Sequence, residues 1–395
     1  MYLPTCTSNL IFNKTHTSYS RLLIACADML IGRIAFFLWT VSSSALAEDI
    51  SNRLGKPIVI DTDIFSDVDD VGSLAVANVL HNYGLADLRG VAVNTHSEYG
   101  ALAVSVINTY FGNGDVPIAA IRPFTDETFF DKRDFVLSEY ASKTAHNWPR
   151  SLNDSSVTPT PVEMYRRILS SAEDHSITLI SIGFLTNLAT LINSPSDDIA
   201  SLTGASLIST KVKELVVMGG RYPSGWEFNF AGFDPASTYD VVNNWPRHVP
   251  ITYSGFELSD NIFSGDKLAD YALPDSPVLA AYQWYVGRCS TTRESWDPVT
   301  TLYGILGLDG SPELGIGKLF EYANENGHNE VSADGSNAWV NNSGVSNQHW
   351  LKLADGVTNI TVAGLLTRFF AHSPLDKSCS TYRRVPFKTN HFVLT

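Results

Sequence analysis

Short apolar runs rich in β-branched residues alternate along the chain with stretches whose apolar residues recur at helical spacing. The runs that predict β-strands cover residues 58–60, 90–93, 177–182, 215–218 and 251–253. Between the first two, Val71, Leu74, Ala75 and Val79 lie on one face of a predicted helix, which we expect Gly84 to end. Helical patterns also cover residues 164–171 and 185–192. This alternation predicts an α/β fold with an open, mostly parallel sheet flanked by helices.

Polar residues and glycines directly follow several of the predicted strands. Asn94 and His96 follow the second strand, a Gly-Phe-Leu-Thr-Asn segment follows the third, and a Gly-Gly-Arg segment precedes Glu227 and Asn229. In open α/β sheets, ligands bind outside the carboxyl ends of the strands. The sequence therefore predicts one site assembled from distant segments that meet at this edge of the sheet.

The first strand ends in an unusually acidic loop. Five aspartates fall within ten residues: Asp61, Asp63, Asp67, Asp69 and Asp70. A helix start favours one or two acids through its macrodipole, but five carboxylates in one loop need either a loop splayed into water or a bound cation as counter-charge. Carboxylate oxygens favour Ca²⁺ or Mg²⁺. An EF-hand loop is excluded, because Phe65 and Ser66 stand where that loop needs Asp or Asn and then Gly.

Charge and length narrow the class of protein. The chain has 395 residues and a formal net charge of −14, which argues against nucleic-acid binding because phosphate backbones are repelled. We see no linker or internal repeat after residue 55, so residues 48–395 are expected to form a single domain. Residues 306–395 carry no recognisable motif and are its less certain C-terminal part.

Residues 1–47 have the composition of a secretory signal peptide. Arg33 precedes an apolar run over residues 34–41, and small residues with Ala45 and Ala47 precede Glu48. The run is too short to span the ~30 Å of a bilayer core, so a membrane anchor is the weaker alternative. We expect a secreted protein with no membrane segment after cleavage. Residues 1–28 are unusual before a signal, so Met29 is an alternative start.

Secretion would place the remaining cysteines, Cys289 and Cys379, in an oxidising compartment where they either pair or stay buried as thiols. Asn-X-Ser/Thr triplets at Asn153, Asn341 and Asn359 fit a glycosylated surface.

The acidic loop and the segments after it resemble a known family. The pair KPIVIDTD and DVDDVGSLA resembles the N-terminal fingerprint of the inosine–uridine-preferring nucleoside hydrolases. GVAVN, SIGFLTNLA, ELVVMGG, EFNFAGFDPAS and SWDPVT resemble later family segments in the expected order, over residues 57 to 305. The resemblance implies a Rossmann-like fold and hydrolysis of the N-glycosidic bond of ribonucleosides. It also implies a homo-oligomer, since the family commonly forms dimers or tetramers.

The resemblance also assigns roles to residues. It implies Ca²⁺ bound by Asp63, Asp70, Asp297 and the backbone carbonyl of Ile182, with Asp63 taking the proton from the attacking water. Asp61 would lie just behind these ligands, either as a supporting partner or satisfying backbone N–H groups.

The ribose hydroxyls would be bound by Asp69, Asn94, Glu227 and Asn229. Glu227 and Asn229 alternate with aromatic residues, so both would project to one side of an extended segment, although an exposed strand would look the same.

Two departures from the family pattern affect the site. Five residues separate Asp63 from Asp69 where most members have three, so Asp67 is an extra acid that either replaces Asp69 or Asp70 as a ligand or lines the loop. Trp296 stands where many members carry a histidine that protonates the leaving base. Tryptophan can stack on a purine, which favours purine nucleosides, or it packs in the core.

Candidate leaving-group acids elsewhere are His96 and His248. The Asn-, Gly- and Ser-rich residues 321–347 are expected to be a surface elaboration.

Two other functions stay open from the sequence. Haloacid-dehalogenase-like phosphatases also place Asp-x-Asp after a buried strand, but here Ile64 and Phe65 follow and no convincing lysine is found. A calcium-stabilised nucleoside-binding protein without turnover is the other alternative.

Overall fold

The computed structural model describes residues 55–65, 67–125, 140–287 and 289–374. The expected signal peptide at residues 1–47, the alternative start at Met29 and the cysteine Cys379 lie outside these residues.

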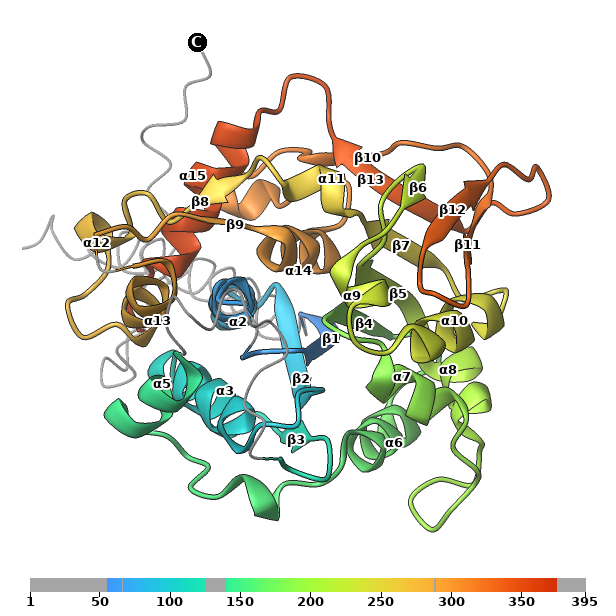
Figure 1. Cartoon of the computed structure of the whole chain (residues 1–395), viewed down its shortest axis with the longest axis horizontal. Helices are drawn as coiled ribbons and strands as arrows, with labels where there is room; N and C mark the ends of the chain where they lie inside the picture. Colours follow the sequence, from blue (N-terminus) through green and yellow to red (C-terminus); the bar gives the residue numbers. More distant parts are fainter. Residues whose placement is uncertain (1–54, 66, 126–139, 288, 375–395) are drawn as a thin grey trace, which may run out of the picture. The chain divides into compact units, whose positions relative to one another are not determined.

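An eight-stranded sheet forms the centre of the domain, with strand order β10-β13-β7-β5-β4-β1-β2-β3 (Figure 1). Its strands are β1 (Lys56–Thr62), β2 (Ala86–Val93), β3 (Ile118–Ala120), β4 (Ile177–Ile182), β5 (Val212–Met218), β7 (Ile251–Ser254), β10 (Phe320–Tyr322) and β13 (Gln348–Leu353). Neighbouring strands are parallel, except that β10 runs antiparallel to β13 at the edge. The prediction of an open, mostly parallel sheet is confirmed.

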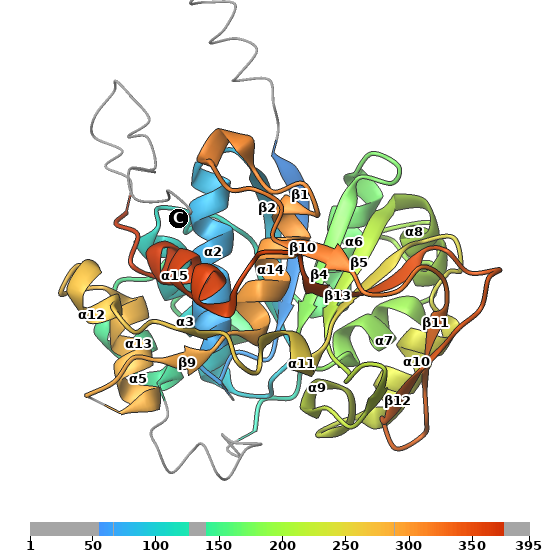
Figure 2. The same cartoon turned by 90° about the horizontal axis from the view of Figure 1, so that it is seen from above.

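Helices cover both faces of this sheet (Figures 1 and 2). One layer contains α2 (Asp69–Asn82), α3 (Glu98–Tyr110), α13 (Pro277–Val286), α14 (Trp296–Leu306) and α15 (Asn359–Phe370). The other contains α6 (Pro161–Ser171), α7 (Thr186–Ile192), α8 (Gly204–Lys211) and α10 (Pro235–Asn244). Shorter helices are α5 (Ala141–Asn147), α9 (Phe228–Ala231), α11 (Phe256–Ser259) and α12 (Leu268–Tyr271), with 3₁₀ turns at Ser155–Val157 and Pro312–Leu314.

The side-chain period of a strand explains why the apolar runs are continuous. Ile58 and Ile60 pack into the first helical layer, whereas Val59 between them packs into the second. Because both faces are buried, apolar residues occupy consecutive positions of a central strand rather than every second one. The five predicted strands and three predicted helices are confirmed, and α2 ends at Asn82, just before Gly84.

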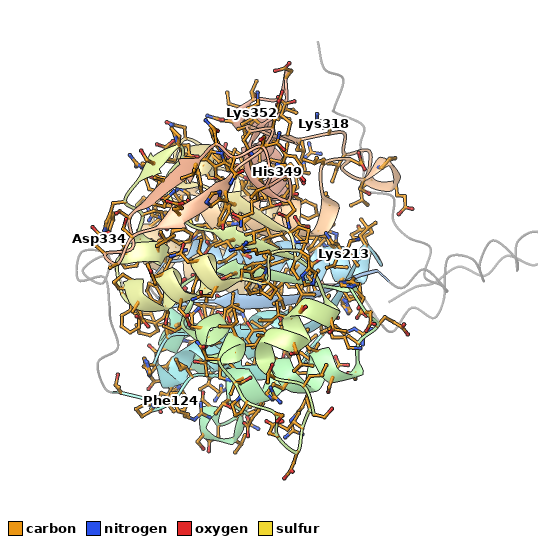
Figure 3. All side chains as sticks on the ribbon, turned by 90° about the vertical axis from the view of Figure 1, so that its right-hand side faces the viewer. Phe124, Lys213, Lys318, Asp334, His349 and Lys352 are labelled. Carbon is orange, nitrogen blue, oxygen red and sulfur yellow. The ribbon has the colours of Figure 1, made fainter. Side chains whose placement is uncertain are left out.

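The C-terminal residues contribute more than expected. The interpretation of residues 321–347 as a surface elaboration is wrong in part, because β10 belongs to the central sheet and β11 (His328–Val331) pairs with β12 (Asn337–Val340). β12 also pairs with β6 (Ser224–Gly225), which makes a three-stranded sheet beside the carboxyl ends of β5 and β7. Asp334, in the turn between β11 and β12, lies at the left edge of the molecule in Figure 3. A two-stranded ladder joins β8 (Phe263–Ser264) to β9 (Arg293–Glu294).

The exposure of particular residues bears on the expected disulfide and glycosylation sites, and the lengths of the helices bear on a membrane segment. Cys289 is exposed, so the alternative of a buried thiol is wrong for this residue, and its pairing with Cys379 stays a prediction. Asn153 and Asn341 are exposed and Asn359 is half-buried. Among the described residues, no helix combines the length and the apolar character needed to cross a bilayer.

Candidate functional site

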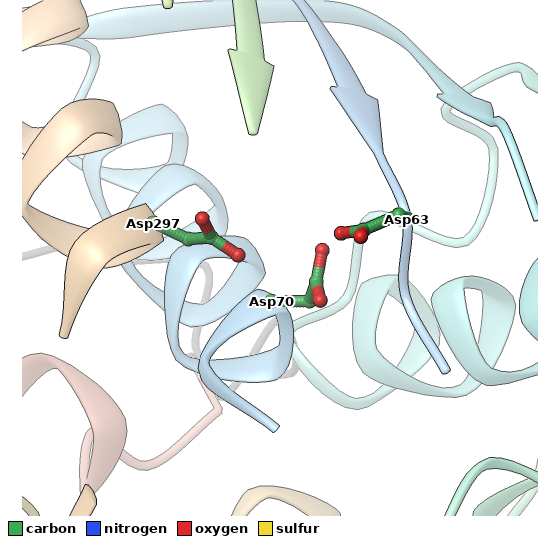
Figure 4. A group of neighbouring side chains, drawn as sticks. All are labelled: Asp63, Asp70 and Asp297. Atoms are coloured by element: carbon green, nitrogen blue, oxygen red, sulfur yellow. The ribbon is translucent and has the colours of Figure 1, made fainter. Parts of the chain in front are cut away.

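Three aspartates from distant parts of the chain meet at the carboxyl edge of the sheet. Asp63 directly follows β1, Asp70 lies in the first turn of α2, and Asp297 lies in the first turn of α14. All three are buried, and one carboxylate oxygen of each lies within 4.8 Å of one from each of the others. Figure 4 shows the three carboxylates converging. The structure therefore brings together the three aspartates that the sequence assigned to a metal.

Electrostatics show that this arrangement suits a cation. Burial, and then the charges of neighbouring aspartates, raise the pKa of the Asp70 and Asp297 carboxyls well above the usual range. One oxygen of Asp70 accepts a hydrogen bond from the Thr62 hydroxyl, but its Oδ2 is buried and has no hydrogen-bond partner. Three hard, anionic oxygen donors with one unsatisfied atom fit a divalent cation such as Ca²⁺ or Mg²⁺.

The end of β4 lies against Asp63. β4 ends at Ile182, which pairs with Thr62 of β1, so its backbone reaches the same edge of the sheet. A Cβ atom on the next residue, Gly183, would lie 2.5 Å from the backbone nitrogen of Asp63. Only glycine fits there, and the close approach keeps the predicted carbonyl ligand at Ile182 beside the aspartates.

Asp61 is held behind the cluster by three donors. Its carboxylate accepts hydrogen bonds from the Tyr165 hydroxyl, from Asn94 Nδ2 at 2.6 Å and from Asn187 Nδ2 at 3.3 Å. These donors stabilise the ionised form, but burial outweighs them and raises the pKa of Asp61 to about 7. Asp61 therefore connects β1 to the end of β2, to α6 and to the start of α7.

Asp67, the extra acid of the loop, is paired with an arginine. Its carboxylate accepts hydrogen bonds from Arg293 Nε and Nη2, the first at 3.0 Å, and both side chains are about four-fifths buried. Asp67 does not belong to the group of three converging aspartates. The structure thus favours a loop-lining role for Asp67, with Arg293 as its counter-ion, over replacement of a metal ligand.

This arrangement predicts different effects from two isosteric substitutions. Asp70→Asn should weaken the binding of a divalent cation such as calcium by more than about a hundredfold, because it removes an anionic oxygen from the cluster. Asp67→Asn should change calcium affinity less than about tenfold, because Arg293 already balances that charge. Isothermal titration calorimetry on both variants measures the difference. Equal losses would show that Asp67 binds the metal.

Asp69 and Asn94 lie beside the cluster. Asp69 Oδ2 accepts a hydrogen bond from the backbone nitrogen of Asp297 at 3.1 Å, which links the starts of α2 and α14. The Nδ2 of Asn94 donates to Asp61 and to the carbonyl of Phe184 at 2.8 Å. Its Oδ1 is buried without a partner, so it can accept a hydrogen bond from a ligand.

Glu227 and Asn229 are arranged differently from the extended segment that their spacing suggested. That expectation is wrong, because α9 begins at Phe228 and Glu227 is its N-cap. The Glu227 carboxylate accepts backbone hydrogen bonds from Asn229, Phe230 and Gly220 at 2.8 to 3.1 Å. Burial still raises its pKa to about 7. Asn229 is also buried, and its Nδ2 donates to Met218 at the end of β5.

Trp296 begins α14 directly before Asp297. Its indole Nε1 donates to the carbonyl of Phe256 at 3.0 Å, and the two rings stack with centroids 5.3 Å apart. The guanidinium carbon of Arg293 lies 5.4 Å from the centroid of the Trp296 ring. The indole is therefore fixed in orientation at the start of α14, where it is partly buried and packs against the hydrophobic core.

The two histidines differ in position. His96 follows the carboxyl end of β2, its Nδ1 lies 2.7 Å from the carbonyl oxygen of Pro123, and its ring centroid is 6.4 Å from that of Phe233. His248 is exposed and precedes β7, at the opposite edge of the sheet. His248 is therefore excluded as an acid for a ligand bound at the aspartates.

Sequence reasoning missed several residues of this site. Asn187 stands within the SIGFLTNLA segment, so its position could have been inferred. Arg293 could have been sought once Asp67 was recognised as an extra charge. Tyr165, on α6, and Phe256, at the start of α11, gave no local indication, because only tertiary contacts bring them here.

Comparison with known proteins agrees with this geometry. No curated protein sequence matches the chain. A plant nucleoside hydrolase has a similar structure, with 19% identity, TM-score 0.54, and 80% of this chain and 99% of that one covered. The inosine-uridine preferring nucleoside hydrolase of Bacillus anthracis is similar as well, with 19% identity and a TM-score of 0.55. The match covers 80% of this chain and 99% of that one. An inosine-guanosine nucleoside hydrolase is also similar, with 15% identity and a TM-score of 0.57. The match covers 81% of this chain and 99% of that one.

The family model described as inosine-uridine preferring nucleoside hydrolase matches residues 58–341. That range begins within β1, includes all three converging aspartates and extends just past β12. The match leaves no support for the phosphatase alternative. With its parallel sheet and its acidic cluster at the carboxyl edge, the chain belongs to the inosine-uridine preferring nucleoside hydrolase family and is a nucleoside hydrolase.

Proposed function

We propose that this hydrolase cleaves the N-glycosidic bond of ribonucleosides to free base and ribose with the help of a bound calcium ion. The observation that supports the proposal is the convergence of Asp63, Asp70 and Asp297 within 4.8 Å of one another in a buried position. Burial disfavours three ionised carboxylates at this distance unless a cation is shared between them. Because residues 1–47 resemble a secretory signal peptide, we also propose that the protein acts on extracellular nucleosides.

Asp63 is the residue we assign to proton transfer. It lies at the end of β1, where the close approach of Gly183 fixes its backbone, so its carboxylate is held at the edge of the sheet. There it accepts the proton of the attacking water as the bond to the base breaks. Calcium, when bound, lowers the pKa of a coordinated water and orients the sugar.

The neighbouring polar groups are assigned to the ribose. The transition state resembles an oxocarbenium ion, so hydrogen bonds to the hydroxyls beside C1′ contribute to its stabilisation. Asn94 offers its unpartnered Oδ1 as an acceptor, and Asp69, Glu227 and Asn229 lie buried at the same edge. These side chains are already held by backbone and side-chain hydrogen bonds, so binding needs little ordering of them.

Trp296 is assigned to the leaving base. Phe256 holds the indole in place, and we assign the part of the ring that neither Phe256 nor Arg293 covers to stacking on a planar base. A purine offers two fused rings to this surface, whereas a pyrimidine offers one. We therefore propose a preference for purine nucleosides.

Trp296→His should reduce the ratio of kcat/KM for inosine to that for uridine by about tenfold, the scale of one base–aromatic stacking contact. Trp226→His is a matched control, because Trp226 is 56% exposed on the neighbouring loop. An unchanged inosine-to-uridine ratio in Trp296→His would refute the stacking role.

Release of reducing sugar from inosine, guanosine, adenosine and uridine tests the function itself. We expect release in calcium, loss after chelation and return when calcium is restored. A protein that binds these nucleosides but releases no sugar from any of them would instead be a nucleoside-binding protein.

A further inference from the structure

The loop that carries Glu227 is held from outside by the C-terminal hairpin. Between β5 and Glu227, Gly220 has φ +77°, a backbone conformation that favours glycine. The backbone nitrogen of Gly220 donates to Glu227 Oε2 at 3.0 Å, so this turn closes directly onto the carboxylate that we assign to the ribose.

The next residue of the turn is bonded to Asn337 of β12. The backbone nitrogen of Arg221 donates to Asn337 Oδ1 at 2.8 Å, and Asn337 Nδ2 donates to the carbonyl of Arg221 at 3.1 Å. One amide side chain thus satisfies both backbone groups of Arg221, as a neighbouring strand would. Asn337 Nδ2 also donates to Asn329 Oδ1 of β11 at 3.0 Å, and both asparagines are buried.

Packing limits movement of this turn. A Cβ atom on Gly220 would lie 3.0 Å from Asn337 Oδ1, so the asparagine is in contact with the turn. Beyond the turn, the backbone nitrogen of Trp339 donates to the carbonyl of Pro223 at 2.7 Å. Successive residues of the turn therefore bond to Glu227 on one side and to the hairpin on the other.

The same turn also reaches the aromatic side of the site. The carbonyl of Gly220 accepts a hydrogen bond from the backbone nitrogen of Phe256 at 2.9 Å, and the guanidinium carbon of Arg221 lies 4.3 Å from the centroid of the Phe256 ring. Phe256 in turn stacks on Trp296. A shift of the turn would therefore move Glu227 and loosen the support of Trp296.

We infer that Asn337 is a positioning residue for nucleoside hydrolysis: through Arg221 and Gly220 it fixes the Glu227 carboxylate where the ribose binds. Asn337 does not touch the substrate. The inference rests on the proposed function, and it gives the C-terminal hairpin a role in substrate binding. The three aspartates lie on other elements, so metal binding does not depend on Asn337.

Asn337→Asp tests the inference with little change in side-chain volume. Aspartate keeps an acceptor for the Arg221 nitrogen but places an oxygen against the Arg221 carbonyl and Asn329 Oδ1. We expect KM for inosine to rise about tenfold or more, as for loss of a buried hydrogen bond that leaves acceptors unpaired. Calcium affinity, measured by calorimetry, should stay within about threefold of wild type, because the three aspartates lie on other elements than Asn337.

A double-mutant cycle separates positioning from a general effect on stability. If Asn337 acts through Glu227, the effects on KM of Asn337→Asp and Glu227→Gln should be strongly non-additive. Asn341→Asp is the matched control, an exposed asparagine just beyond β12 that should leave KM unchanged. Asn329→Ala, which removes the acceptor behind Asn337 together with the Nδ2 group of that side chain, is a further variant and should raise KM in the same direction if Asn337→Asp does not fold.

Each outcome decides the inference. An Asn337→Asp enzyme with the KM of Asn341→Asp, or effects that add to those of Glu227→Gln, would overturn it while leaving the proposed function intact. If Asn337→Asp does not fold, an unchanged KM in Asn329→Ala would overturn it as well. A wild-type protein that releases no ribose from any nucleoside would overturn the proposed function and this inference with it.

Discussion

Asp63→Asn is expected to lower kcat/KM for ribonucleoside hydrolysis by about a thousandfold or more. Asparagine has the same shape but is a far weaker base, and it offers the metal a neutral oxygen in place of an anionic one. Kinetics with inosine in saturating calcium measure the loss. Asp67→Asn, in the same loop but paired with Arg293, is the control and should retain most of the activity.

Asp63→Asn should not unfold the protein. The buried aspartates raise one another's pKa values, and removing one of them relieves repulsion in the metal-free protein. The melting temperature of metal-free Asp63→Asn should therefore equal or exceed that of the metal-free wild type. Full activity in a folded Asp63→Asn protein would remove the basis for its catalytic assignment.

Chelation of calcium is expected to abolish hydrolysis and to lower the melting temperature. A ligand present at a hundred times its dissociation constant stabilises the native state by about 2.7 kcal/mol. With an unfolding entropy of about 2.1 cal/mol/K per residue, this corresponds to a shift of roughly 4 °C in a domain of this size. Differential scanning calorimetry with and without calcium measures the shift. Asp70→Asn should show almost none, because it lacks one of the three converging carboxylates.

The increase in melting temperature that calcium causes should become larger as the pH rises. In the metal-free protein, the raised pKa values of Asp70 and Asp297 mean that these carboxyls keep protons that ordinary aspartates have lost. Calcium binds the ionised form, so its binding releases protons and its affinity rises with pH. The increase in melting temperature should be larger at pH 8 than at pH 5. An increase that is the same at both pH values would argue against a site made of these carboxylates.

The sequence was sufficient to predict the sheet and the place of the site. Strands such as β1, where Ile58, Val59 and Ile60 are consecutive and buried, produce a short apolar run followed by polar residues, which is typical of a buried strand. Because parallel strands end at a common edge, the residues that follow them had to meet there. The aspartates that follow β1 and start α2 were therefore predictable from their positions in the chain.

Other parts of the site depend on contacts that local pattern does not encode. α9 has four residues, too few to show a helical period, so Glu227 was interpreted as part of an extended segment. Asp67 and Arg293 are 226 residues apart, and only the folded chain shows that they pair. β10, β11 and β12 are three or four residues long and partly polar, so the hairpin that holds the Glu227 loop had no recognisable strand pattern.

The central claim is that Asp63, Asp70 and Asp297 together bind one divalent cation. A crystal structure of the protein grown in millimolar calcium, with anomalous scattering data, tests it most directly. We expect a calcium peak about 2.3–2.6 Å from an oxygen of each carboxylate. Well-ordered carboxylates with no anomalous peak between them would contradict the account.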